Sequence, residues 1–207
     1  MKKFIAILSV FVIVLSVSAC GGKAKYQFKN IGIYDTSTQQ YVEIGDSKKE
    51  VEKILGSGEV DGSFYDYDDD ITISYDENEN VDYISVYYDS FDVYDRENEY
   101  RYELPGGIRK TSSVTDFIEL FPHVYVDDEF SLDSKNAVVI IRELREKRYV
   151  MSREELVKLE EKDDFEGTFY KMEIDYFSYD EIVWIKVGRI KYPDVQNWGK
   201  SLVDINK

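Results

Sequence analysis

The chain has 207 residues and a net charge of −16, with 42 acidic and 26 basic side chains. So acidic a composition argues against nucleic-acid binding, because affinity for a phosphate backbone comes from Lys and Arg. The 18 tyrosines, 11 phenylalanines and 2 tryptophans argue against an acidic disordered chain, which is poor in aromatic residues. They favour one folded domain or two small ones.

Residues 1–19 are expected to be a lipoprotein signal peptide. Two lysines precede the uncharged apolar run "FIAILSVFVIVLSVSA", and a positive start followed by an apolar core is typical of such peptides. The stretch "VSAC" at residues 17–20 resembles the bacterial lipobox, which implies cleavage before Cys20 and a diacylglycerol on its sulfur. An uncleaved helical anchor is the alternative. Cys20 is the only cysteine, so no disulfide can form within the chain.

Residues 20–39 are predicted to form the lipidated N-terminus and a tether. Two or three acyl chains anchor a protein durably to a bilayer, whereas a single chain binds only marginally. We therefore expect the protein in the cell envelope, lipid-anchored to the outer face of the cell membrane.

Residues 40–104 are predicted to form a first helix–hairpin repeat. Ser47, with Glu50 three residues later, indicates the capped start of a short helix that ends at Gly56. Beyond it, period-two alternation in "ITISYDENENVDYISVYY" predicts two antiparallel strands joined by a polar loop. Because so short a helix is not stable alone, we expect it to lie on these strands.

Residues 105–192 are predicted to form a second, degenerate repeat. The stretch "SSVTDFIELFP" aligns with "SKKEVEKILG" when Ser113 is matched to Ser47, and strand-like sequences follow in both copies. An inserted helix, "SREELVKLEE", interrupts the second copy, and residues 193–207 are expected to be a C-terminal tail. The predicted fold class is α+β, with short helices packed on an antiparallel sheet.

A glycine-polar cap and a short amphipathic helix that ends in glycine precede the hairpin, and the residues of this pattern are Ile44, Gly45, Ser47, Val51, Leu55 and Gly56. Through this pattern the first repeat resembles the helix-and-hairpin unit of the beta-lactamase inhibitory protein-like fold, and it is similar to units in small bacterial lipoproteins of the outer-membrane assembly type. The resemblance covers roughly residues 40–90 and is degenerate over 107–192. It implies a lipoprotein or secreted inhibitor that binds another protein through its sheet, and it implies no particular contact residue.

Tyrosines on the predicted strands are the candidate partner-binding residues, because Tyr and Trp are enriched at protein interfaces. Both faces of the hairpin carry tyrosines, so they cannot all lie in one core. We expect an acidic, tyrosine-rich sheet face that binds a protein, with its charge favouring a basic partner. Trp184, in contrast, is expected in the core. The candidate residues are Tyr65, Tyr67, Tyr75, Tyr83, Tyr87 and Tyr88.

No motif predicts a cofactor, a catalytic centre or a specific metal site. The only histidine, His123, has no nucleophile motif to accompany it. The loop "DENEN" lacks the later glycine and bidentate acid of an EF-hand. The remaining possibility is weak cation binding by the acidic run Asp66, Asp68, Asp69 and Asp70.

The leading hypothesis is a non-enzymatic, surface-tethered lipoprotein that binds another envelope or extracellular protein. Inhibitor, immunity and assembly roles all fit this hypothesis. A small-ligand or cation-binding lipoprotein is the alternative, and a cell-wall hydrolase is a third class.

Overall fold

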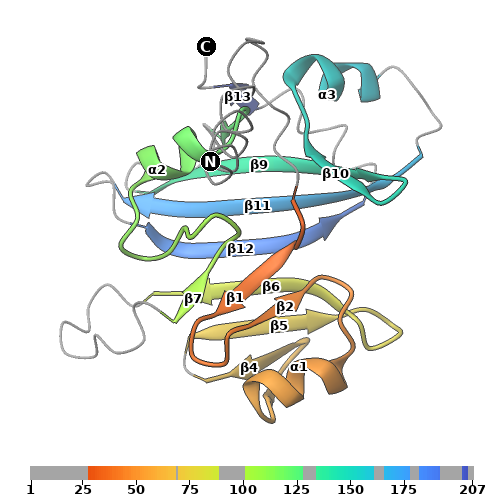
Figure 1. Cartoon of the computed structure of the whole chain (residues 1–207), viewed down its shortest axis with the longest axis vertical. Helices are drawn as coiled ribbons and strands as arrows, with labels where there is room; N and C mark the ends of the chain where they lie inside the picture. The colour runs from red at the N-terminus through yellow and green to blue at the C-terminus, as the bar shows by residue number, and fades with distance from the viewer. Residues whose placement is uncertain are drawn as a thin grey trace, which may run out of the picture.

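The computed structural model describes residues 28–68, 70–88, 101–127, 134–160, 166–177, 182–191 and 202–204. The signal peptide and Cys20 lie outside these residues. The described part of the chain is an α+β fold, in which short helices pack on antiparallel sheet, and this confirms the predicted fold class (Figure 1).

The central element is a ten-stranded antiparallel sheet with the order β13-β8-β9-β11-β12-β6-β5-β4-β3 and with β10 paired to β9. One half contains β3 (Glu59–Asp61), β4 (Phe64–Tyr67), β5 (Ile71–Tyr75) and β6 (Val81–Tyr87). The other contains β8 (Tyr125–Asp127), β9 (Ser134–Leu144), β10 (Lys147–Val150), β11 (Thr168–Phe177), β12 (Ile182–Ile190) and β13 (Leu202–Asp204).

The two halves share one order of elements, a helix followed by antiparallel strands, and they join where β6 pairs with β12. Helix α1 (Lys48–Leu55) begins the first half, and helix α2 (Val114–Leu120) begins the second. Both starts are capped as their sequences predict: the backbone N–H of Ser47 donates to Glu50, and that of Ser113 donates to Asp116. The inserted helix is α3 (Arg153–Glu160).

A second, three-stranded sheet was not predicted. It contains β1 (Gly32–Asp35), β2 (Gln40–Glu43) and β7 (Tyr102–Glu103), in the order β2-β1-β7. Phe28, Ile31 and Ile33 are buried. The predicted tether of residues 20–39 is therefore wrong from Phe28 onward, because these apolar side chains complete the core. The C-terminal tail also differs from its prediction, since β13 extends the large sheet beyond β8.

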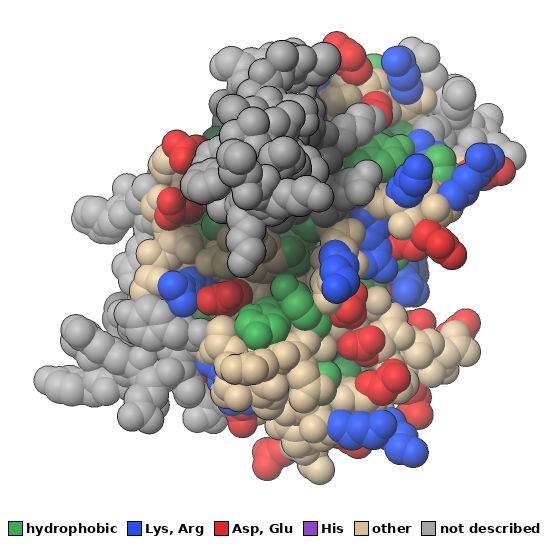
Figure 2. Space-filling view, in the orientation of Figure 1, with side chains coloured by type: hydrophobic (Ala, Val, Ile, Leu, Met, Phe, Trp, Pro, Cys, Tyr) green, Lys and Arg blue, Asp and Glu red, His purple; other side chains and the backbone are tan. Residues whose placement is uncertain are grey.

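One face of the large sheet, the inner face, carries the main core. The side chains of Ile71, Ile73, Ile84 and Val86 alternate onto this face of β5 and β6, and all four are at most 1% exposed. Val51 of α1, Phe117 of α2 and the apolar residues of the small sheet pack against it. Figure 1 shows α1, α2 and the small sheet in front of the large sheet. On this side, charged side chains of both signs surround recessed hydrophobic ones (Figure 2).

The opposite, outer face is covered at one end by α3. Leu156 and Leu159 of this helix are buried against Val138 and Ile140 of β9 and Phe169 of β11, which make a second, smaller core. Strand β9 is thus buried on both faces, whereas Thr72, Ser74 and Tyr87 on the outer face of β5 and β6 are at least partly exposed. The part of the outer face that no described helix or strand covers is the candidate site.

Candidate functional site

The part of the outer face that no described helix or strand covers, called the open face below, runs across the centre of the large sheet. Strand register aligns its side chains: Trp184 and Lys186 of β12 lie opposite Tyr87 and Ser85 of β6. No helix of the described chain covers it, since α3 packs over β8, β9 and the Phe169 end of β11. The open face contains Asp66, Thr72, Tyr83, Ser85, Tyr87, Lys171, Glu173, Asp175, Trp184 and Lys186.

An aromatic pair marks the middle of the open face. The rings of Tyr87 and Trp184 meet edge to face, with centroids 5.3 Å apart, a favourable geometry for aromatic rings. The indole N–H of Trp184 donates to the Ser85 hydroxyl, and the ammonium of Lys186 lies 4.5 Å from the indole centroid. The indole is therefore held in place, while Tyr87 is 44% exposed and available for contact.

Beside this pair lies a half-buried network of two lysines and two carboxylates. Glu173 is only 4% exposed, and its carboxylate forms ion pairs with Lys171 and with Lys186, the latter at 3.2 Å. Lys186 also pairs with Asp175. Burying a carboxylate is costly unless it is paired, so these contacts explain how the sheet can carry charge at its centre.

The network shifts the pKa of each of three members in a defined direction. Burial by itself would raise the pKa of Glu173, but the charges of Lys171 and Lys186 lower it below its usual value. Burial likewise works against the charged form of Lys186, yet Glu173 and Asp175 hold its pKa above the usual value. Asp175 differs, because burial and the neighbouring Glu173 outweigh Lys186 and raise its pKa to about 6.

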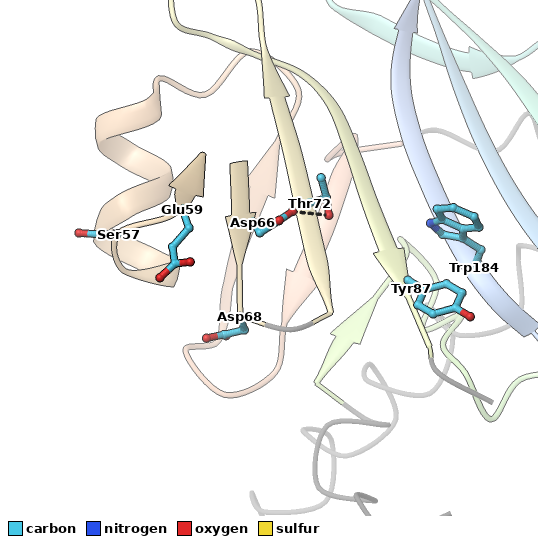
Figure 3. Close-up of a pocket in the computed structure, with 7 residues that line it drawn as sticks. All are labelled: Ser57, Glu59, Asp66, Asp68, Thr72, Tyr87 and Trp184. Atoms are coloured by element: carbon cyan, nitrogen blue, oxygen red, sulfur yellow. Dashed lines mark hydrogen bonds between the residues drawn. The ribbon is translucent and has the colours of Figure 1, made fainter. Parts of the chain in front are cut away.

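An open groove lies between the aromatic pair and the β3–β4 end of the sheet. It is lined by Ser57, Glu59, Asp66, Asp68, Thr72, Tyr87 and Trp184. Figure 3 shows three carboxylates on one side of this space and the two rings on the other. One oxygen of Asp66 accepts a hydrogen bond of 2.9 Å from the Thr72 hydroxyl, and Asp68 forms an ion pair with Arg101.

Two of the six predicted tyrosines, Tyr83 and Tyr87, lie on the open face. The ring of Tyr83 lies over Gly188, where a Cβ would come within 2.8 Å of it, and it meets Phe64 edge to face at 6.4 Å. Burial raises the pKa of Tyr83. The absence of a side chain at Gly188 therefore gives this ring its place on the sheet.

The other four tyrosines lie on the inner side. Tyr65 and Tyr75 are partly buried against the main core, where their rings meet edge to face at 5.2 Å. Tyr67 and Tyr88 are 1% and 3% exposed, so their prediction as partner-binding residues is wrong. Both are core residues because their hydroxyls find partners inside: that of Tyr67 lies 2.6 Å from the Tyr75 hydroxyl, and that of Tyr88 donates to the Tyr102 carbonyl.

Trp184 was expected in the core and lies instead on the open face. The signal in the sequence was the alternation of "VWIKV", which places Trp184 and Lys186 on one face and Val183, Ile185 and Val187 on the other. The charged network was also missed. The same alternation in "KMEIDY" aligns Lys171, Glu173 and Asp175, but their meeting with Lys186 depends on the pairing of β11 with β12.

The acidic run suggested as a weak cation site is only partly described, since Asp69 lies outside the described residues. Asp66 and Asp68 interact with Thr72 and Arg101. In the part of the chain that the structure describes, no three His, Cys, Asp or Glu side chains come together as a set of metal ligands. Within the same residues, no helix is long and apolar enough to span a membrane.

No protein-family model, curated protein or solved structure matches the chain. The resemblance to the beta-lactamase inhibitory protein-like fold therefore stays a prediction, and the function is inferred from the open face itself.

Proposed function

We propose that this chain is a lipid-anchored envelope protein that binds another protein through the open face and has no catalytic role. The observation that supports this most directly is the exposed Tyr87 ring beside the anchored Trp184 on the central strands. Binding energy at protein interfaces concentrates in Tyr, Trp and Arg side chains, and these act best when they are already held in place.

The shape of the face favours a protein over a small molecule. Small-molecule sites are concave and enclose most of their ligand, whereas the open face extends across several strands and its groove is open. The paired charges around Glu173 add polar groups already ordered by the fold. A partner of complementary shape would therefore bind with little loss of side-chain freedom.

The anchor would keep this face close to the bilayer. Phe28, the first residue that the structure describes, is buried, and residues 21–27 lie between it and Cys20. When fully extended, this stretch spans at most roughly 30 Å. The partner is then a protein that is itself at the membrane surface or reaches it.

The proposal is tested by photo-crosslinking in intact cells. A photoreactive residue, p-benzoylphenylalanine, is placed at Tyr87 or, as a control, at Val157 on the exposed side of α3, where the native side chain is 40% exposed. We expect one protein adduct from position 87 that is absent from position 157. The adduct should disappear when Trp184→Ala removes the neighbouring ring.

Adducts of the same masses from both positions would indicate non-specific collisions and would contradict the proposal, as would the absence of any adduct from position 87. The anchor is tested in parallel with an alkyne-labelled fatty acid. Labelling should depend on Cys20 and be lost in Cys20→Ala.

A further inference from the structure

We infer that the groove between the Tyr87–Trp184 pair and the β3–β4 edge receives a cationic side chain of the partner, with arginine as the best fit. The inference rests on the proposed function, because it names the chemistry of the partner that docks on the open face. Three features of the groove carry it.

The first feature is charge complementarity. Within the described chain, the residues that line the groove include Glu59, Asp66 and Asp68 and no basic side chain. Asp68 already shares its charge with Arg101. The remaining negative charge belongs to Glu59 and Asp66, which face a space that the fold leaves open (Figure 3).

The second feature is a like-charge pair built into the sheet. Glu59 and Asp66 are direct partners in the β3–β4 ladder, so their side chains stand next to each other on the same face. Like charges directly opposite each other destabilise an antiparallel pair. A cation bound next to both carboxylates would offset this repulsion.

The third feature is the aromatic wall. Arg and Lys are attracted to the faces of Trp and Tyr rings, and Lys186 already makes such a contact with Trp184. Tyr87 is 44% exposed beside it. A guanidinium is planar and can stack on a ring while donating to a carboxylate, which a compact ammonium does less well. The groove is lined by carboxylates on one side and by these rings on the other.

The inference can be tested without the partner, using N-acetyl-arginine amide as the probe and N-acetyl-citrulline amide as a neutral probe of nearly the same shape. The full chain, purified in detergent micelles with ¹⁵N-labelled tryptophan, is titrated with each at constant ionic strength. The chain has two tryptophans, and Trp184→Phe assigns the indole signal of Trp184. We expect this signal to shift with the arginine probe and not with the citrulline probe.

Paired variants locate the effect. The double variant Glu59→Gln/Asp66→Asn should weaken the response to arginine about five-fold or more. It should also raise the melting temperature, because the cross-strand repulsion is gone while the new amide oxygen at position 66 can still accept from the Thr72 hydroxyl. The matched control Glu77→Gln/Glu119→Gln removes the same amount of charge at exposed positions outside the groove, and it should respond like the unaltered chain.

An equal response to citrulline, or an unchanged response in Glu59→Gln/Asp66→Asn, would overturn the inference. So would a lower melting temperature of that double variant. These outcomes are separable from those of the crosslinking experiment. If the adduct at position 87 forms and its yield is unaffected by the double variant, the docking face stands and the cation site fails. If no adduct forms, the docking proposal fails whatever the probe does.

Discussion

The two halves of the sheet share one plan and differ in what lies on their outer face. Each half has a helix, α1 or α2, on the inner face and antiparallel strands behind it. In the second half, α3 covers the outer face and creates a second core with β9 and β11. In the first half, no described element covers the outer face of β4, β5 and β6. Polar and aromatic side chains occupy that face.

The sequences of the strands reflect this difference. In β9, Ala137 to Ile141 are all buried, so the strand reads as a continuous apolar run. In β5, Ile71 and Ile73 are buried while Thr72 and Ser74 are partly exposed. Comparison of the two halves teaches that one inserted helix is enough to turn part of a sheet face into a core, and that the strands beyond its reach keep a surface available for binding.

The largest expected effect comes from disrupting the second, smaller core under α3. Leu159 is fully buried, so Leu159→Ala should lower the free energy of unfolding by about 2–5 kcal/mol, through lost burial and the cavity left behind. Urea denaturation followed by circular dichroism measures this. Val157→Ala, on the exposed side of the same helix, should change stability by no more than about 0.5 kcal/mol.

Equal losses in the two variants would show that α3 does not form a core in solution. The comparison between the halves would then fail, because both outer faces would be surface.

A smaller effect tests whether helices α1 and α2, which begin the two halves, are equivalent. The Ser113 hydroxyl accepts the backbone N–H of Asp116 at 3.1 Å, and the Ser47 hydroxyl contacts Glu50 at 2.7 Å. Ser113→Ala and Ser47→Ala should each cost about 1 kcal/mol, since the cap satisfies groups that the helix leaves unpaired. Thr115→Ala, exposed on α2, serves as the control and should be nearly neutral. If one cap cost several times more than the other, the two helices would not be equivalent.

An effect of similar size, seen only when the pH is changed, tests the charged network of the open face. Because the pKa of Asp175 is raised to about 6, the folded protein binds this proton more tightly than the unfolded chain does. Stability from this group is present at low pH and is lost as pH rises through 6. Between pH 7.5 and 5 the free energy of unfolding should therefore increase by about 1 kcal/mol relative to Asp175→Asn.

Urea titrations of both proteins across this range provide the measurement. Parallel pH profiles of the unaltered chain and Asp175→Asn would contradict the raised pKa. Glu173 does not interfere between pH 7.5 and 5. Its pKa is lowered, so the stability that it contributes is lost only at more acidic pH.

Local patterns in the sequence were sufficient for several elements of the fold. Ser47 and Glu50 predicted the start of α1, and alternation predicted the β5–β6 hairpin with its polar turn. In that turn Asp76 accepts backbone N–H bonds from Asn78 and Asn80, as its composition suggested. These features depend on residues a few positions apart, so one sequence contains the information.

The small sheet and the burial of Tyr67 and Tyr88 could not be predicted from such short-range patterns. Strand β1 pairs with β7, and Tyr88 bonds to the Tyr102 carbonyl across the chain. A tyrosine that alternates onto one face of a strand can be core or contact surface, depending on which distant segment covers that face. The alternation of side chains along a strand decides which residues share a face. It does not decide which other segment of the chain packs against that face.

By itself, then, the sequence determined the α+β class, the helix starts and the sets of residues that lie together on each strand, because hydrogen bonding and alternation act over short distances. Only the tertiary structure decided that α3 covers one half of the outer face, that Trp184 meets Tyr87, and that Lys186 holds Glu173 and Asp175. These contacts follow from strand pairing between segments far apart in the chain, whose free energy belongs to the assembled fold and not to any single stretch.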